Sequence, residues 1–266
     1  DMLHSQFIRK DRRDKEEQIL EVGKEGSKEK GIWITTQVVE ASLDIDFDIL
    51  ITELSDLNSL FQRMGRCFRK REFNSEGYNC YVYTGSKEGT TGVGFFIDSE
   101  IFEMSKKAIS KIDGYLSEEK KMKMVEELYS TENLEGTEYL KTLREQIRYV
   151  KSIQDFEKSK KEIKKIFRNI DSVNAIPKVV YDENKEKIDE YIRIINSDAS
   201  RKERMRARSN LMDYTLNVPW YMVGVNDDYL RINKYEAIAI LNQKYSKEKG
   251  LMYAKKTDLS IEDRII

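Results

Sequence analysis

Residues 62–69, QRMGRCFR, place three arginines and a glutamine within eight positions. Guanidinium groups are planar and permanently charged, so they suit the oxygens of a phosphoryl group in transfer. On a helix, Gln62, Arg66 and Arg69 would share one face, while Arg63 would point aside. This spacing predicts a phosphate-binding arrangement.

The neighbours of these arginines leave two explanations open. Gly65 would let a backbone or a phosphate approach closely, at a helix-forming cost of about 1 kcal/mol. No carboxylate occurs between Asp56 and Glu72, so like charges would repel on a purely structural face. The structural alternative is a solvated basic helix, or a helix that holds a carboxylate partner.

A second polar run lies upstream of the arginines. Thr35, Thr36 and Gln37 end a stretch rich in β-branched residues, and hydroxyl and amide groups at a strand end can bind sugar-phosphate oxygens. Asp44 follows, and a carboxylate near such a site can accept a hydrogen bond from a ribose hydroxyl. The run therefore favours a nucleotide or nucleic-acid site.

A metal site is the alternative for this run. Asp44, Asp46 and Asp48 alternate like one face of a strand, but hard cations usually need further oxygen ligands. His4 is the single histidine, so no multi-histidine centre can form within the chain. We expect no metal held by this chain.

The elements that must position these residues alternate between strand and helix. Residues 11–22 predict a helix, and residues 32–39, 47–53 and 79–85 predict strands. Ser55 or Asp56 could cap a helix that carries the arginines. Such alternation predicts an α/β fold in which helices flank a parallel sheet, with ligands at the carboxyl ends of the strands.

The remainder of the chain changes character. Residues 99–169 contain no proline and repeat apolar residues at three and four, which predicts helices. Further along, β signals occur at residues 169–182, YTLNV and YMVGV. Helices are expected near 184–196 and 199–212, and a final segment lies around 234–245. We predict an α/β domain over residues 1–98, a helical connector over 99–170 and a small α+β domain over 171–266.

Composition limits the classes of protein that fit. Among 266 residues, 47 lysines and arginines balance 48 aspartates and glutamates, so nucleic-acid binding would depend on local patches. Two cysteines are too few for a disulfide framework. No apolar stretch approaches the roughly 20 residues that cross a bilayer, so we expect a cytoplasmic protein without membrane contact.

The two polar runs together resemble motifs V and VI of superfamily 2 helicases, which lie in the second of two RecA-like lobes. Residues 36–48, TQVVEASLDIDFD, are similar more narrowly to the CRISPR-associated helicases of type I interference systems, which often also carry a nuclease. HSQFIRKDR, residues 4–12, resembles motif IV of that family. The resemblance covers residues 3–70, and beyond about residue 100 it rests on domain order alone.

The resemblance implies roles at the ATP site. Arg66 and Arg69 match the arginines that reach the γ-phosphate, and Gln62 matches the residue that senses the nucleotide. Asp44 matches the aspartate near the ribose. Arg63 matches the arginine that ties motif VI to its surroundings.

The resemblance also implies contacts with a bound strand. Thr36 matches the threonine that contacts the nucleic-acid backbone, and its neighbours Thr35 and Gln37 are expected to bind there too. His4 and Ser5 match motif IV, near the bound strand. One departure is Phe68, where many superfamily members have glycine. Every arginine nevertheless stays in register.

Several motifs of a complete motor are absent from the sequence. It contains no G-x-x-x-x-G-K-[ST] loop, no D-E-x-[HD] box and no His-Asp nuclease cluster. The resemblance therefore implies half of an ATP site, with ATP and Mg²⁺ held mainly by a first RecA-like lobe. The implied partners are that lobe, an HD nuclease domain, single-stranded DNA and the CRISPR RNA-guided surveillance complex.

We expect the C-terminal portion of an ATP-dependent DNA helicase, inactive by itself. Two rivals remain: the second lobe of another superfamily 2 RNA or DNA motor, and a non-catalytic nucleic-acid-binding module. The basic stretches 157–168 and 201–208 could line a path for DNA, or could be solvated helix faces.

Overall fold

The computed structural model describes residues 1–41, 43–74, 76–85, 92–94, 96–152, 172–224 and 227–252. Ser42 and the basic stretch 157–168 lie outside these residues. The chain forms two compact units. Unit 1 comprises Asp1–Gln18, Gly31–Val38 and Asn169–Ile266, and unit 2 comprises Ile19–Lys30 and Val39–Arg168.

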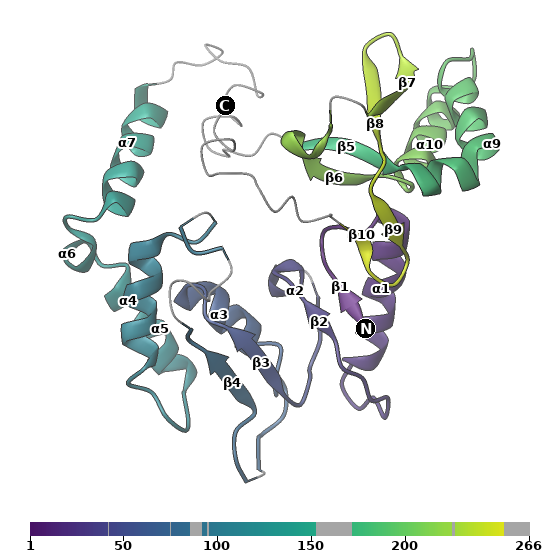
Figure 1. Cartoon of the computed structure of the whole chain (residues 1–266). Helices are drawn as coiled ribbons and strands as arrows, with labels where there is room; N and C mark the ends of the chain where they lie inside the picture. The colour runs from purple at the N-terminus through teal and green to yellow at the C-terminus, as the bar shows by residue number, and fades with distance from the viewer. Residues whose placement is uncertain are drawn as a thin grey trace. The chain divides into compact units, whose positions relative to one another are not determined.

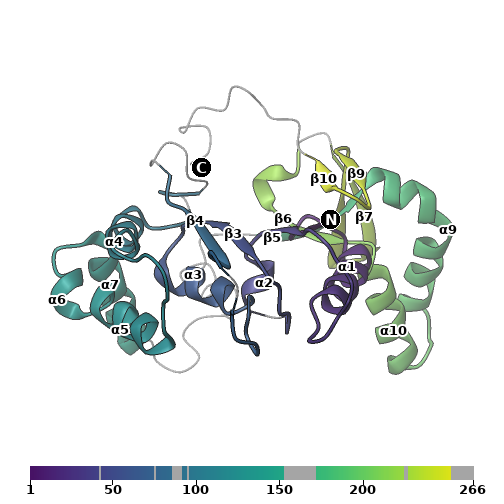
Figure 2. The same ribbon diagram turned by 90° about the horizontal axis from the view of Figure 1, so that it is seen from below.

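Unit 1 contains a mixed four-stranded sheet packed against two helices (Figure 1). The strand order is β6-β5-β8-β7, with β5 parallel to β8 and the two outer pairs antiparallel. The helices α9 and α10 lie side by side in both ribbon views (Figure 2). These elements are β5 (Ser172–Pro177), α9 (Lys178–Ile195), α10 (Arg201–Met212), β6 (Leu216–Pro219), β7 (Asp228–Asn233) and β8 (Glu236–Leu241).

The core of unit 1 is aliphatic. Ile188 of α9, Leu211 of α10 and Ile232 of β7 are at most 1% exposed, and burying such side chains stabilises the fold by about 1.5–3 kcal/mol each. Helix α10 begins at a capping box in which Ser200 and Glu203 exchange hydrogen bonds. Sheet and helices therefore share one apolar interior.

The N-terminal residues fold with this sheet in unit 1. Strand β1 (Met2–Leu3) pairs in parallel with β2 (Ile34–Thr35). The antiparallel strands β9 (Lys244–Ser246) and β10 (Gly250–Met252) form a hairpin. Unit 1 also contains the short helix η1 (Trp220–Met222) and most of α1 (Arg9–Val22).

Unit 2 pairs two parallel strands with a group of helices. Strand β3 (Leu50–Glu53) lies beside β4 (Cys80–Tyr83), with Leu50 opposite Cys80. Leu57, Leu60 and Phe102 are completely buried in its core. The helices are α2 (Val38–Ala41), α3 (Leu57–Met64), α4 (Ser99–Ile109), α5 (Glu118–Leu128), α6 (Thr131–Leu134) and α7 (Glu138–Ser152).

Most predicted elements are present, with two local corrections. The helices expected after residue 99 are confirmed through Ser152, and those expected near 184–196 and 199–212 are α9 and α10. The strand expected over residues 32–39 is only two residues long and gives way to α2. YMVGV was wrongly predicted as β, because its described residues form η1 and a bend.

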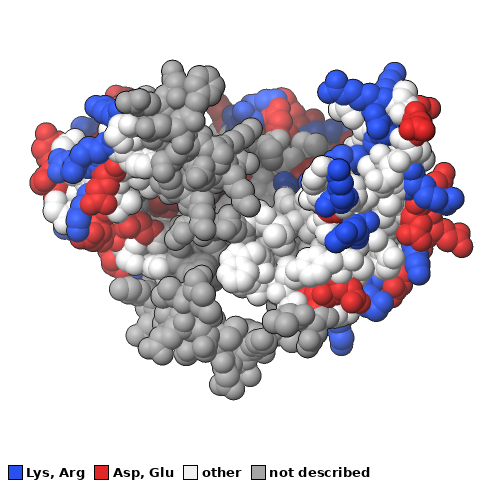
Figure 3. Space-filling view, turned by 90° about the horizontal axis from the view of Figure 1, so that it is seen from above, with Lys and Arg blue, Asp and Glu red and all other residues white. Residues whose placement is uncertain are grey.

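The fold is mixed α/β. Among the described residues, the strands of the first 98 positions form separate two-stranded sheets, so a single RecA-like sheet is not seen there. The predicted RecA-like lobe and the three domain boundaries remain predictions. None of the described helices combines the length and apolarity needed to cross a bilayer, and Figure 3 shows both signs of charge interspersed on one face.

Candidate functional site

The helix that leads to the arginines is set by its two ends. Asp56 caps α3, as predicted, by accepting a hydrogen bond from the Ser59 N–H at 3.0 Å. The helix ends at Met64, and the N–H of Gly65 donates to the Phe61 carbonyl. Arg66 and Arg69 therefore lie beyond the helix, and the prediction of one helical face with Gln62 was wrong.

Arg63 is held inside unit 2 by a buried carboxylate. Its Nη1 donates to Glu40 Oε1 at 2.5 Å, and the two side chains are 13% and 11% exposed. Its Nη2 donates to the Glu53 carbonyl and to Ser55 Oγ, each at 3.0 Å. Arg63 thus joins α2, β3 and α3.

Arg66 is held by a backbone group instead. Its Nη2 donates to the Glu40 carbonyl at 2.5 Å, whereas its buried Nε has no hydrogen-bond partner among the described residues. Burial lowers the pKa of Arg66, Arg69 lowers it further, and Asp44 partly opposes the shift. An additional anion beside Arg66 would therefore be favourable.

Arg69 forms an ion pair with Asp44. The two side chains are 43% and 68% exposed, and exposed pairs of this kind contribute only about 0–1 kcal/mol. Gln62 is exposed on the last turn of α3. Four predicted ATP-site residues thus make polar contacts with other parts of unit 2, namely Asp44, Arg63, Arg66 and Arg69. We call Gln62, Arg63, Arg66 and Arg69, with Glu40 and Asp44, the arginine cluster.

The loop after α3 is organised by a carboxylate that the sequence did not single out for this role. The side chain of Asp46 is 5% exposed and accepts hydrogen bonds from the Arg69 N–H and Arg71 Nε, each at 2.9 Å. Burial raises the pKa of Asp46, but hydrogen bonds from Arg71 and from the Arg69 and Lys70 backbone reverse this and lower it overall. Asp46 therefore sets the backbone path at Arg69.

The conformation and contacts of Phe68 explain how a phenylalanine can stand where many superfamily members have glycine. Its φ is 50°, in the left-handed region that favours glycine. The Arg71 guanidinium lies 4.5 Å from the Phe68 ring centroid, and the Phe73 ring packs edge-on at 5.0 Å. These contacts offset the backbone strain, so the loop adopts a glycine-type turn without glycine.

The three aspartates of the metal alternative pair with arginines in the structure. Asp44 pairs with Arg69, whereas Asp46 and Asp48 both pair with Arg71. Across the described ranges, no three His, Cys, Asp or Glu side chains gather as metal ligands. The carboxylates serve here to hold guanidinium groups.

The predicted nucleic-acid residues lie in unit 1. Strand β1 ends just before His4 and Ser5, and β2 ends at Thr35, opposite Leu3. The Thr36 N–H donates to the Leu3 carbonyl at 3.4 Å. Because β1 and β2 are parallel, their carboxyl ends lie side by side, and the predicted nucleic-acid residues follow there. Ser5, Thr36 and Gln37 are exposed, and Thr35 and His4 are half-buried.

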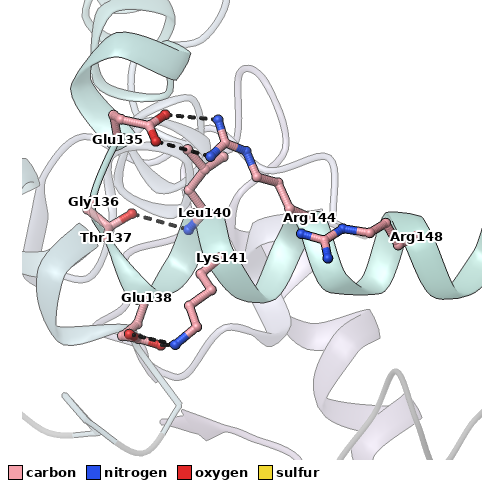
Figure 4. A pocket seen from close by; sticks show the side chains of 8 residues that line it. All are labelled: Glu135, Gly136, Thr137, Glu138, Leu140, Lys141, Arg144 and Arg148. Carbon is pink, nitrogen blue, oxygen red and sulfur yellow. Dashed lines mark hydrogen bonds and ion pairs between the residues drawn. The ribbon is translucent and has the colours of Figure 1, made fainter.

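A shallow pocket in unit 2 lies between α6 and α7 and contains none of these residues (Figure 4). Both Glu135 oxygens accept hydrogen bonds from Arg144, at 3.1 and 2.8 Å, and Lys141 pairs with Glu138. Two of its basic side chains are therefore already paired with carboxylates. The arginine cluster is a stronger candidate site than this pocket, because the buried Nε of Arg66 has no hydrogen-bond partner among the described residues.

Comparison with known proteins points to one family. Residues 1–72 match the family model described as CRISPR-associated nuclease/helicase Cas3, C-terminal. A Cas3 nuclease/helicase of Methanothermobacter thermautotrophicus is 31% identical over 175 residues, which are 64% of this chain and 20% of that protein. The chain thus spans about a fifth of this relative.

Solved structures share the fold. The T. fusca Cas3 structure titled with AMPPNP superposes with a TM-score of 0.62 at 16% identity, covering 96% of this chain and 33% of that one. A chain in the structure titled "CRISPR RNA-guided surveillance complex, pre-nicking" gives 0.58 at 18% identity, covering 96% and 35%. The predicted resemblance is confirmed, and this chain is similar to the C-terminal region of the Cas3 CRISPR nuclease/helicases.

Proposed function

We propose that this chain supplies the second-lobe half of an ATP-dependent single-stranded DNA helicase in type I CRISPR interference. The arginine cluster forms one wall of an ATP site, and a first RecA-like lobe supplies the phosphate loop and the Mg²⁺ ligands. His4, Ser5, Thr35, Thr36 and Gln37 contact the DNA strand.

The observation that carries this proposal is Arg66. Arg63 and Arg69 each pair with a carboxylate of this chain. A purely structural role, in which arginines hold carboxylate partners, would explain these two residues. Arg66 forms no ion pair with any described residue, although it is half-buried and lies near Arg69. A half-buried guanidinium whose charge is only partly offset by Asp44 is unfavourable, so a phosphate group from outside the chain is the natural partner.

The contacts indicate what each side chain does. Glu40 orients two arginines at once, Arg63 through its carboxylate and Arg66 through its carbonyl. Arg69 can exchange Asp44 for a phosphate oxygen at little cost, because the Asp44 pair is exposed. Both guanidinium groups would then stabilise the charge that develops on the transferred phosphoryl group.

The relatives support the ligands and partners of the proposal. T. fusca Cas3 structures carry AMPPNP, ATP or ADP in their titles, which agrees with ATP as the substrate. The surveillance-complex match favours an RNA-guided complex as the partner. Mg²⁺ would be bound by the first lobe, because the described part of this chain contains no cluster of metal ligands.

The test is Arg66→Ala and Arg69→Ala in a protein that joins this chain to its ATP-binding lobe. Arginine fingers contribute about 10³–10⁵ to turnover, so each variant should lower DNA-stimulated kcat by about a thousandfold. Arg144→Ala is the matched control, since Arg144 is 46% exposed, pairs with a glutamate and lies outside the cluster.

Unchanged turnover in the Arg66→Ala protein would overturn the proposal. The 266-residue chain by itself should hydrolyse ATP only at background rate. Rapid hydrolysis by the isolated chain would show instead that it contains a complete site.

A further inference from the structure

The start of α1 is capped by residues distant in the sequence. The Ile8 carbonyl accepts the first helical bond, from Arg12, so Ile8 is the N-cap, but its side chain cannot accept a hydrogen bond. The N–H groups of Arg9 and Lys10 instead donate to the carbonyls of Thr215 and Asp213, each at 2.9 Å. Part of the C-terminal half thus supplies the missing cap.

Tyr245 on β9 completes this capping arrangement. Its hydroxyl accepts a hydrogen bond from the Ile8 N–H at 3.2 Å and donates to Asp11 Oδ2 at 2.6 Å. Asp11 is 5% exposed, so its carboxylate depends on this donor. One hydroxyl therefore joins the hairpin to both ends of the first turn of α1.

Strand β10 of the same hairpin lies against the predicted DNA-binding segment. The Leu251 N–H donates to the Gln6 carbonyl at 2.9 Å. Gly250 has a φ of 70°, and a Cβ there would lie 2.7 Å from the Gln6 oxygen and 2.9 Å from His4 Cε1. Only glycine permits this close approach.

His4 is fixed within this contact. Its ring stacks on Phe7 at 4.5 Å, and its Nδ1 accepts a hydrogen bond from the Gln6 N–H at 3.2 Å. Burial lowers the pKa of His4, a hydrogen bond with the Lys249 backbone partly raises it, and Lys15 lowers it. The environment of His4 is therefore a direct report on hairpin docking.

We infer that the β9–β10 hairpin positions residues 4–8 of the motif IV segment, with Tyr245 and Gly250 as the positioning residues that hold them in place. Neither residue is proposed to touch nucleic acid. The consequence for DNA binding rests on the proposed function, but the positioning itself does not.

The positioning is tested first in the 266-residue chain without a histidine tag. His4 is its single histidine, so its ring protons give one titration curve by NMR. In Tyr245→Phe and Gly250→Ala, the pKa of His4 should rise toward its ordinary value of about 6.5, with the larger change in Gly250→Ala. Tyr235→Phe, at an 86% exposed tyrosine of the same unit, should leave the curve unchanged.

The second measurement is the affinity of the two-lobed protein for oligo(dT) at fixed salt, together with KM for ATP. Loss of the Tyr245 hydroxyl should weaken DNA binding about tenfold and leave KM for ATP unchanged. Unchanged His4 titration in both variants would overturn the positioning. A shifted titration with unchanged DNA affinity would support the positioning and overturn the DNA-binding role of His4 and Ser5.

Discussion

The motif IV segment and the arginine cluster are held by different kinds of interaction. In unit 1, residues 4–10 are held mainly by hydrogen bonds to backbone N–H and carbonyl groups. In unit 2, carboxylates hold Arg63, Arg69 and Arg71. Backbone bonds keep a shape whatever the pH, whereas ion pairs respond to pH, salt and incoming anions. We therefore expect the ion pairs of the cluster to exchange partners more readily than the backbone bonds of the motif IV segment.

Arg63→Ala should break the cluster most severely. Glu40 is 9% exposed, and removing one member of a buried ion pair costs about 3–5 kcal/mol because the other charge is left without a partner. We expect an early unfolding transition of unit 2 by circular dichroism in urea. Arg144→Ala should cost at most about 1 kcal/mol.

Urea unfolding of the Arg63→Ala protein also distinguishes the transitions of the two units. Both tryptophans, Trp33 and Trp220, belong to unit 1, so tryptophan fluorescence reports on unit 1. Its transition should not move in the Arg63→Ala protein. A loss of stability below about 1 kcal/mol by circular dichroism would show that the Glu40–Arg63 pair is not buried in solution.

Asp46→Asn should have an intermediate effect that depends on pH. The pKa of Asp46 is lowered in the fold, so its stabilisation is present above the unfolded-state pKa of about 3.9 and is lost as pH falls through the lower folded value. The variant should lose about 1–2 kcal/mol at pH 7, and this difference should shrink below about pH 4.

Urea unfolding at pH 7 and at pH 3 measures this difference for Asp46→Asn. Equal differences at the two values would contradict the assignment of Asp46 as a charged acceptor. The fluorescence transition of unit 1 provides the internal control, because Asp46 belongs to unit 2.

Phe68→Gly should have the smallest effect, because opposing terms nearly cancel. Glycine relieves a left-handed backbone strain of about 1–2 kcal/mol but loses the Arg71 and Phe73 contacts, worth about 1 kcal/mol together, and adds unfolded-state entropy. The unfolding free energy should change by less than about 1 kcal/mol. A loss above about 2 kcal/mol would show that the aromatic contacts dominate this loop.

Local patterns explain why much of the fold could be predicted. The cap at Asp56, the helices after residue 99 and the helices α9 and α10 follow from residue types and short-range periodicity. The arrangement after Met64 could not be predicted in this way. A basic run continues past Gly65, yet the helix ends there and Phe68 adopts a left-handed φ supported by Arg71.

The candidate site shows the same division. The residue types of QRMGRCFR predicted an anion site but not its geometry, because no local rule identifies the partners of each guanidinium. Asp46 drew attention only as a metal ligand, and in the structure it organises the arginine loop. Tyr245 and Gly250 carry no sequence signal, since their meaning depends on a distant segment.

By itself, the sequence determined the family resemblance, the chemistry available to the arginines and the order of the helices and strands, because these depend on residue types and short spacings. Only the tertiary structure decided which groups meet. Glu40 and Arg63 are 23 positions apart, and Asp11 and Tyr245 are 234 apart. Contacts over such separations are set by how the elements pack, which spacing along the chain does not record.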